Sequence, residues 1–185
     1  IPGHIDPVVT PRAITPRSDG RLDLMGLSHL QIKQLFLESQ LDDKAAKLRS
    51  KQVFHWIYHR GVTDFEMMTD IAKTTRELLA AHAEIRDLTV IRDSTASDGT
   101  RKRLFDVGSS AVDAVFIPEE DRGTLCISSQ AGCALDCAFC STGKQGFNRN
   151  LSTGEIIGQL RYADKVLKAD MGIDGRTPDG VQPVT

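Results

Sequence analysis

Between residues 22 and 86 the apolar residues recur every three or four positions, as they do on one side of an amphipathic helix. The first helix is expected to begin at Ser28, because SHLQ has the form of a capping box. A second helix is expected over residues 44–59, closed by Gly61, and a third over residues 75–83. The residues expected on the inner sides of these helices are Leu30, Leu35, Phe36, Ala45, Leu48, Val53, Trp56, Ile57, Leu78, Leu79 and His82.

After Ile85 the pattern changes to short extended runs that are typical of strands. LTVIRD, TRKRLFDV and AVDAVFIP are separated by the turn sequences SDG and GSS, and together they predict a small antiparallel meander. Its middle strand carries Arg101, Lys102 and Arg103, which suit contacts with an RNA backbone. Charges on an exposed strand edge also deter aggregation, and this second interpretation is the favoured one.

A short strand in TLCISS, a loop rich in cysteine and a strong helix come next. Ser152 and Glu155 form a second capping box, and the apolar side of the helix contains Ile156, Leu160, Ala163 and Leu167. Strand, loop and helix make one unit of a parallel β/α barrel, in which functional residues follow the carboxyl ends of the strands. The predicted fold class is α/β: a leader (1–21), a helical N-terminal domain (22–86), a short antiparallel β-subdomain (87–118) and the first β/α unit of a truncated barrel (119–185).

The composition is that of an ordinary globular protein. The chain has 185 residues, 40% hydrophobic and 26% charged, with a formal net charge of −2. This near-neutral charge argues against strong non-specific binding of nucleic acid by the whole surface, and the absence of a long apolar stretch argues against a membrane role. The proline-rich opening is expected to be unstructured, and the Gly/Pro-rich end is an unusual place for a domain to stop. The chain is therefore expected to be a fragment.

All four cysteines fall close together, at Cys126, Cys133, Cys137 and Cys140, and the last three have the spacing C-x3-C-x2-C. Three thiolates on one loop can hold three irons of a 4Fe-4S cluster and leave the fourth iron open to a small molecule such as S-adenosylmethionine (SAM). A disulfide is disfavoured, because no secretion signal opens the chain. A four-cysteine zinc site is the stronger alternative, although structural zinc sites usually have two separated C-x2-C pairs.

Two further pairs are candidate site residues. His55 and His59 stand four residues apart on the second helix, a spacing that binds zinc when a third ligand joins, but no third ligand is evident. Lys144 and Arg149 flank the cysteine loop and suit phosphate contact. Arg149 suits equally well a brace for the loop backbone.

The run IPEEDRGTLCISSQAGCALDCAFCSTGKQGFNRNLSTGEIIGQL closely resembles the bacterial dual-specificity rRNA/tRNA adenine-C2 methyltransferases of the RlmN/Cfr family, which are radical SAM enzymes. The resemblance continues through RSKQVFHWIYHRGVTDFEMMTDI and SDGTRKRLFDV and covers roughly residues 22–169. It implies that the truncated barrel is the start of a radical SAM core.

The resemblance also implies roles for single residues. Cys133, Cys137 and Cys140 match the cluster ligands, and Cys126 matches a second cysteine that forms a disulfide with a methyl-carrying cysteine at the end of the reaction. Asp113 stands where the family usually has a glutamate that accepts the proton of adenine carbon 2. Aspartate is one methylene shorter, so the reach of this base is in question; a solvent-facing strand carboxylate is the structural alternative.

The implied cofactors are a 4Fe-4S cluster and SAM, and the implied partners are 23S rRNA, tRNA and an electron donor such as flavodoxin. In this family one SAM methylates a cysteine, and a second SAM yields a deoxyadenosyl radical that activates this methyl for addition to the base. The chain has no cysteine after Cys140 and no Gly-rich SAM segment, so it is expected to be inactive alone. A monomeric, cytoplasmic protein is expected, and a zinc-containing RNA-binding module is the alternative function.

Overall fold

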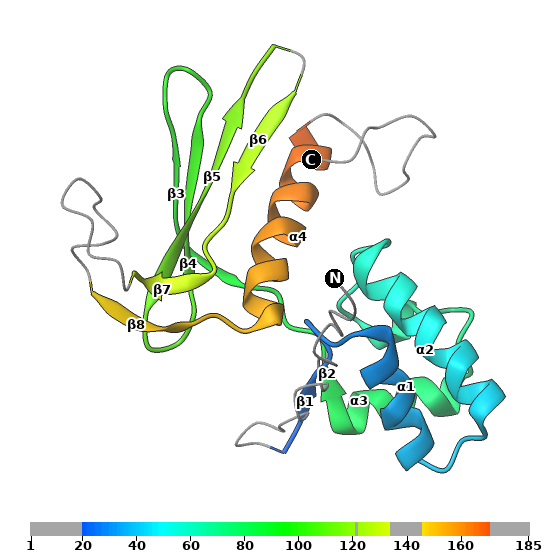
Figure 1. Ribbon diagram of the computed structural model, residues 1–185. Coiled ribbons are helices and arrows are strands. Elements are labelled where there is room, and N and C mark those ends of the chain that lie inside the picture. The colour runs from blue at the N-terminus through cyan, green and yellow to red at the C-terminus, as the bar shows by residue number, and fades with distance from the viewer. Residues whose placement is uncertain (1–19, 121, 134–145, 171–185) are drawn as a thin grey trace, which may run out of the picture.

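The computed structural model describes residues 20–120, 122–133 and 146–170. A helical N-terminal unit and an antiparallel sheet lie on either side of a long helix, α4 (Figure 1). The fold is therefore mixed α/β, as the sequence predicts. The expected leader falls outside the described residues up to position 19. In the part of the chain that is described, no helix is both long enough and apolar enough to cross a lipid bilayer.

The helical unit contains three helices and one short 3-10 turn. The capping box predicted at Ser28 is confirmed, because the Ser28 hydroxyl accepts the Gln31 N–H while the Gln31 side chain accepts the Ser28 N–H. The second helix begins one residue earlier than predicted, since the carboxylate of Asp42 accepts the N–H of Ala45 and caps it. The elements are α1 (His29–Glu38), α2 (Asp43–Tyr58), η1 (Phe65–Met67) and α3 (Lys73–His82).

The core of this unit uses a partly different set of side chains from the predicted one. Leu30 and Leu48 were expected inside, but their side chains are 69% and 53% exposed. On α2 the buried residues follow one another at i, i+4, i+7 and i+11, and Leu48 lies on the opposite side of the helix. Leu78 and His82 are also exposed on α3, whereas Leu79 is buried as expected. The buried residues of α2 are Ala46, Ser50, Val53 and Ile57.

The predicted meander is confirmed and is one strand longer than expected. Four strands pair antiparallel in chain order, and β4 therefore lies inside the sheet between β3 and β5. Charges on β4 do not protect a strand edge, and that interpretation of Arg101, Lys102 and Arg103 is wrong. The strands are β3 (Thr89–Thr95), β4 (Arg101–Asp106), β5 (Ala111–Pro118) and β6 (Gly123–Cys126).

The segment TLCISS was predicted to form the strand of the first β/α unit, and its residues 124–126 do lie in a strand, which is the last one of the meander. Gly123–Cys126 is the edge strand of the meander, paired antiparallel with β5. Two small pairs complete the strands: β1 (Leu22–Asp23) is parallel to β2 (Ala83–Glu84), and β7 (Gln130–Gly132) is antiparallel to β8 (Phe147–Asn150). A run of four residues such as GTLC fits parallel and antiparallel pairing equally well, so the neighbouring strand determines which of the two forms.

One face of the meander packs against α4 (Thr153–Asp170). The ring of Phe105 meets that of Tyr162 edge-on at 5.3 Å between centroids, and the guanidinium of Arg103 lies 5.5 Å from the same ring. Arg103 is buried and pairs with Asp93 at 3.1 Å. Buried residues of this second core are Phe105, Val107, Val112, Ala114, Ala131 and Leu151.

The helical unit docks on α4 through glycines and one arginine. A side chain at Gly26 would collide with the backbone of Gly154, so the two chain segments approach as closely as only glycine allows. Arg161 donates to the carbonyl oxygens of Ile57 and Gly61, at the end of α2, and pairs with Asp87 at 2.9 Å. These contacts fix the helical unit against the helix that also supports the sheet.

Candidate functional site

Asp113 and Cys126 lie on the face of the meander that does not pack against α4. In an antiparallel sheet, paired residues share a face, and so do residues two apart on one strand. Cys126 is paired with Val115, which is two residues from Asp113. Val115 is in turn paired with Lys102. We call the side formed by Lys102, Leu104, Asp113, Val115 and Cys126 the open face.

The two candidate residues differ in their surroundings. Cys126 is exposed and forms no disulfide. The Asp113 side chain is 38% exposed, and its Oδ2 lies 2.9 Å from Nζ of Lys102. The backbone carbonyl of Asp113 accepts a hydrogen bond of 2.8 Å from the Ser128 hydroxyl. Asp113 is therefore an ion-paired, partly covered carboxylate with a fixed backbone rather than a freely solvated one.

The cysteine segment begins and ends at the small β7–β8 pair. The N–H of Cys133 donates to the carbonyl of Gly146 at 3.1 Å, which joins the two ends of the segment. Gly132 has a φ of 72° and no room for a side chain beside Gly146, so this position requires glycine. Cys133 is half-buried at one end. Cys137, Cys140 and Lys144 lie outside the described residues.

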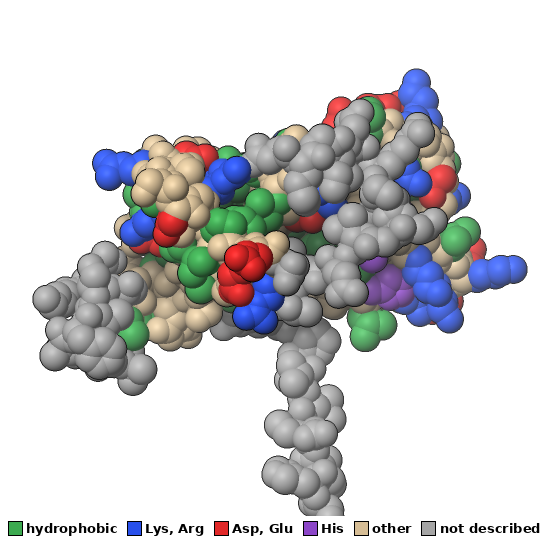
Figure 2. Space-filling model, turned by 90° about the horizontal axis from the view of Figure 1, so that it is seen from above, with side chains coloured by type: hydrophobic (Ala, Val, Ile, Leu, Met, Phe, Trp, Pro, Cys, Tyr) green, Lys and Arg blue, Asp and Glu red, His purple; other side chains and the backbone are tan. Residues whose placement is uncertain are grey.

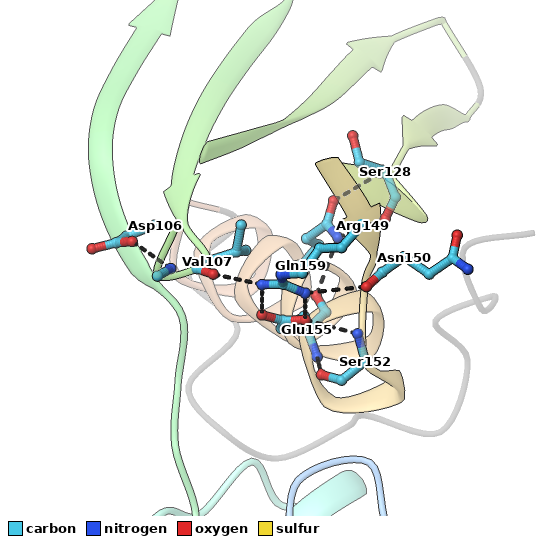
Figure 3. A network of polar contacts seen from close by, with 9 residues as sticks. Asp106, Val107, Ser128, Arg149, Asn150, Ser152, Glu155 and Gln159 are labelled. Atoms are coloured by element: carbon cyan, nitrogen blue, oxygen red, sulfur yellow. Dashed lines mark hydrogen bonds and ion pairs between the residues drawn. The ribbon is translucent and has the colours of Figure 1, made fainter. Parts of the chain in front are cut away.

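A buried glutamine holds the backbone segment that runs from Cys126 to Cys133. The side-chain carbonyl of Gln159 accepts the Ser128 N–H at 2.9 Å, and its amide donates to the Ser128 carbonyl at 2.9 Å. The same amide donates to the carbonyl of Glu155 at 3.1 Å, and Gln159 has no exposed surface. Figure 3 shows this pairing beside the contacts of Arg149. Ser128 is thus tied to α4 on one side and to Asp113 on the other.

Arg149 acts as a brace, which is one of the two roles that the sequence leaves open for it. Its guanidinium donates to both carboxylate oxygens of Glu155, at 2.9 and 2.7 Å, and to the carbonyl of Val107 (Figure 3). The predicted capping box is confirmed, because Glu155 accepts the Ser152 N–H at 2.7 Å and the Ser152 hydroxyl accepts the Glu155 N–H. One side chain therefore joins β8, α4 and the loop after β4.

The ion pair between Arg149 and Glu155 shifts the pKa of both side chains. Burial by itself raises the pKa of Glu155, but the hydrogen bonds from Arg149 and Ser152 outweigh it and hold this pKa below its ordinary value. The hydrogen bond with Glu155 raises the pKa of Arg149. Both groups are charged at neutral pH, and both terminal nitrogens of Arg149 donate hydrogen bonds within the protein.

His55 and His59 stack on each other at 5.0 Å between ring centroids. Figure 2 shows histidine and basic side chains next to one another on the side of the molecule where α2 lies. Arg60 lies 4.8 Å above the ring of Trp56 in the same region. Across residues 20–120, 122–133 and 146–170, no group of three potential metal donors comes together, so the two histidines gain no third ligand there.

Sequence reasoning missed Gln159 and Ser128. A signal for Gln159 was present, because it lies three residues after Ile156 and four before Ala163 and is thus a polar residue within the predicted apolar side of α4. A buried amide at such a position needs partners, and here it finds the backbone of an irregular segment. Nothing in the sequence marked Ser128 as its partner.

Known proteins match this chain over most of its length. Residues 22–85 match the family model of the ribosomal RNA large subunit methyltransferase N-terminal domain. Proteins named dual-specificity RNA methyltransferase RlmN are 55% identical in Novosphingobium aromaticivorans and 56% identical in Erythrobacter litoralis, each over 168 residues. These matches cover 90% of this chain and 39% and 40% of the two relatives, so the chain spans about two fifths of their length.

A solved structure is also similar. The crystal structure of a radical SAM methyltransferase from Sphaerobacter thermophilus matches with a TM-score of 0.69 and 32% identity, over 84% of this chain and 44% of that protein. The helical unit corresponds to the domain described by the family model, and the similarity of sequence continues through the meander and the cysteine segment to α4. Over the part that it spans, the chain is similar to the RNA methyltransferases named RlmN.

Proposed function

We propose that the protein carrying this chain methylates carbon 2 of adenine in 23S rRNA and tRNA by radical SAM chemistry. The observation that carries the proposal is the placement of Asp113 and Cys126 on one open face of the sheet, shortly before Cys133. The names of the similar proteins support it, since they include RNA methyltransferases and a radical SAM methyltransferase.

Cys133, Cys137 and Cys140 are the residues that would hold the 4Fe-4S cluster. Three thiols at this spacing supply the donor set that a cluster with one open iron requires. When bound, the cluster and SAM supply a carbon radical, which can add to a carbon that has no lone pair. Carbon 2 of adenine is such a carbon, so a polar methyl transfer would lack its nucleophile.

The open face supplies the two groups that complete the reaction. Asp113 accepts the proton of carbon 2, and its carboxylate is held by Lys102 at 2.9 Å. Cys126 is exposed. A cysteine that forms a disulfide with another cysteine of the protein during turnover must be accessible in this way. Ser128 and Gln159 hold the backbone between these groups and Cys133.

The partners and location are part of the same proposal. Structured RNA is the substrate, and a one-electron donor such as flavodoxin would supply the electron that a bound cluster needs. The protein acts as a monomer in the cytoplasm. These points rest on the family and on the chemistry that a reduced cluster requires.

Anaerobic reconstitution of this chain with iron and sulfide tests the metal. We expect a brown protein with about four irons per chain, lost in Cys137→Ser and retained in Cys126→Ala. Zinc in place of iron in an oxygen-free preparation, with weaker zinc binding in Cys126→Ala, would contradict the proposal and favour the RNA-binding zinc module.

RNA methylation is tested in a joined enzyme, in which this chain replaces the matching 39% of the N. aromaticivorans relative. We expect 2-methyladenine in both 23S rRNA and tRNA fragments, detected by mass spectrometry of the nucleosides. A methyl group on any other atom, or on neither RNA, would count against the proposed function.

A further inference from the structure

Lys102 is the only charged neighbour within ion-pair distance of Asp113 in the described part of the chain. Its Nζ lies 2.9 Å from Oδ2 of Asp113, and the two side chains are 57% and 38% exposed. Lys102 lies on the interior strand β4, where the need to protect a strand edge does not explain its charge. Its neighbours Arg101 and Arg103 point to the other face, and Arg103 is used there by Asp93 and Tyr162.

The register places Lys102 in line with the candidate thiol. Lys102 pairs with Val115, and Val115 pairs with Cys126, so the three form one row across three strands. Adjacent strands lie about 4.8 Å apart, and the backbones of Lys102 and Cys126 are therefore about 10 Å apart. Asp113 stands in the neighbouring row and is joined to Lys102 diagonally. Ammonium, carboxylate and thiol thus border one patch of the open face.

The ion pair with Lys102 uses one carboxylate oxygen of Asp113 and does not involve the other. Oδ2 of Asp113 contacts Lys102, whereas Oδ1 has no hydrogen-bond partner among the residues that the structure describes. The backbone of Asp113 is held independently by the Ser128 hydroxyl. With backbone and Oδ2 both fixed, the orientation of the carboxylate is determined by Lys102.

We infer that Lys102 is a positioning residue, which holds the Asp113 carboxylate so that Oδ1 can take the proton of the substrate carbon. The inference rests on the proposed function. In the step it serves, the C–H bond breaks, its electron pair stays with the adenine ring, and the proton bonds to Oδ1. An aspartate is one methylene shorter than the glutamate usual at this position, so its orientation decides whether it reaches the proton.

The test uses the joined enzyme with Lys102→Met and Lys102→Arg. If proton removal is slowed, the covalent enzyme–RNA intermediate waits longer before it is resolved. We expect Lys102→Met to raise the ratio of crosslinked enzyme to methylated RNA about fivefold, which corresponds to the ~1 kcal/mol that an exposed ion pair contributes. Loading of the methyl group onto the enzyme should stay unchanged, and Lys102→Arg should restore the ratio.

Lys73→Met is the matched control, because Lys73 forms an exposed ion pair with Glu77 at 3.8 Å on α3. It should leave the ratio unchanged. An unchanged ratio in Lys102→Met, or an equal loss of methyl loading and of product, would overturn the inference while the proposed function stands. An unaltered joined enzyme that neither crosslinks nor methylates RNA would overturn the proposed function, and the role of Lys102 with it.

Discussion

The side chain of Gln159 pairs with both backbone groups of Ser128, at 2.9 Å in each direction, as a neighbouring strand would. The pair lies where the chain leaves β6 and approaches the first cysteine of the candidate cluster motif. The backbone between β6 and β7 is thereby held by side-chain hydrogen bonds in place of those of a neighbouring strand. α4 supports the site through this single amide and through the brace of Arg149.

Replacement of Gln159 should destabilise the protein strongly. Gln159→Leu leaves the N–H and the carbonyl of the half-buried Ser128 without their partner, and each such group costs up to about 1–3 kcal/mol. We expect a loss of about 2–4 kcal/mol in the free energy of unfolding by urea. The control is Gln34→Leu on the exposed side of α1, where Gln34 bonds only Glu38, and less than about 0.5 kcal/mol is expected.

The ion pair of Glu155 makes stability depend on pH. The pKa of Glu155 is lowered on folding, so its contribution is complete above the unfolded pKa and is lost as the pH falls through the folded value. The fall in stability should begin near pH 5 and continue below the ordinary glutamate pKa of about 4.3.

Comparison of urea midpoints at pH 7 and pH 3.5 for the native chain and Glu155→Gln measures this contribution. Glu155→Gln should lose about 1–2 kcal/mol at pH 7, as expected for a lost helix cap, and should lose less at pH 3.5. An identical difference at both pH values would show that the carboxylate charge plays no part.

The close approach of Gly26 and Gly154 predicts a severe effect of one added methyl group. Gly26→Ala introduces a Cβ into the backbone of Gly154 at a φ of 86°, so clash and backbone strain add up. Gly108→Ala is the matched control, with a φ of 84° and open space around its Cβ position.

Both variants should lose about 1 kcal/mol from the backbone conformation, and Gly26→Ala should lose about 2 kcal/mol more from the clash. Limited proteolysis after Arg86 should also speed up only in Gly26→Ala, because the helical unit is then displaced from α4. Equal stability of the two variants would mean that the docking tolerates the shift.

Asp113 can be tested directly in the joined enzyme. Asp113→Asn removes the proton acceptor and should slow resolution of the RNA crosslink about 10²–10⁴-fold, the range of general base catalysis. Asp113→Glu should retain methylation, since it restores the residue usual in the family. Asp106→Asn is a control on an exposed strand carboxylate that accepts only the Gly108 N–H. Rapid methylation by Asp113→Asn would remove Asp113 from the mechanism.

Local signals in the sequence predicted local structure well. The capping boxes at Ser28 and Ser152 both form, because each is specified by two residues three positions apart. The choice of buried side chains was less predictable: Leu48 is exposed, whereas the smaller Ala46 and Ser50 of the same helix are buried. A helix with apolar residues on two sides does not show which side finds a partner.

Non-local pairing was the part that the sequence did not determine. The four residues of β6 fit a parallel barrel strand as well as an antiparallel edge, and the assignment depended on which strand lies beside them. The strand order is also not visible in the sequence, which is why the charge of Lys102 was interpreted as protection of a strand edge. The candidate residues themselves were found by motif and resemblance, whereas their meeting on one open face required the register of three strands.

The contacts of Arg161 with Ile57 and Gly61 have a consequence for synthesis on the ribosome. The carbonyl groups at the end of α2 are made 104 and 100 positions before the arginine that binds them. At a translation rate of about 5–20 residues per second, they wait about 5–20 seconds in a nascent chain whose first unit can already fold. We therefore expect the newborn helical unit to leave the exit tunnel with the carbonyl groups of Ile57 and Gly61 exposed to water, until the later helix emerges and Arg161 binds them. Faster amide exchange at residues 57–61 in a released chain that ends near residue 120 than in the released chain of 185 residues would show that the later helix protects these carbonyl groups.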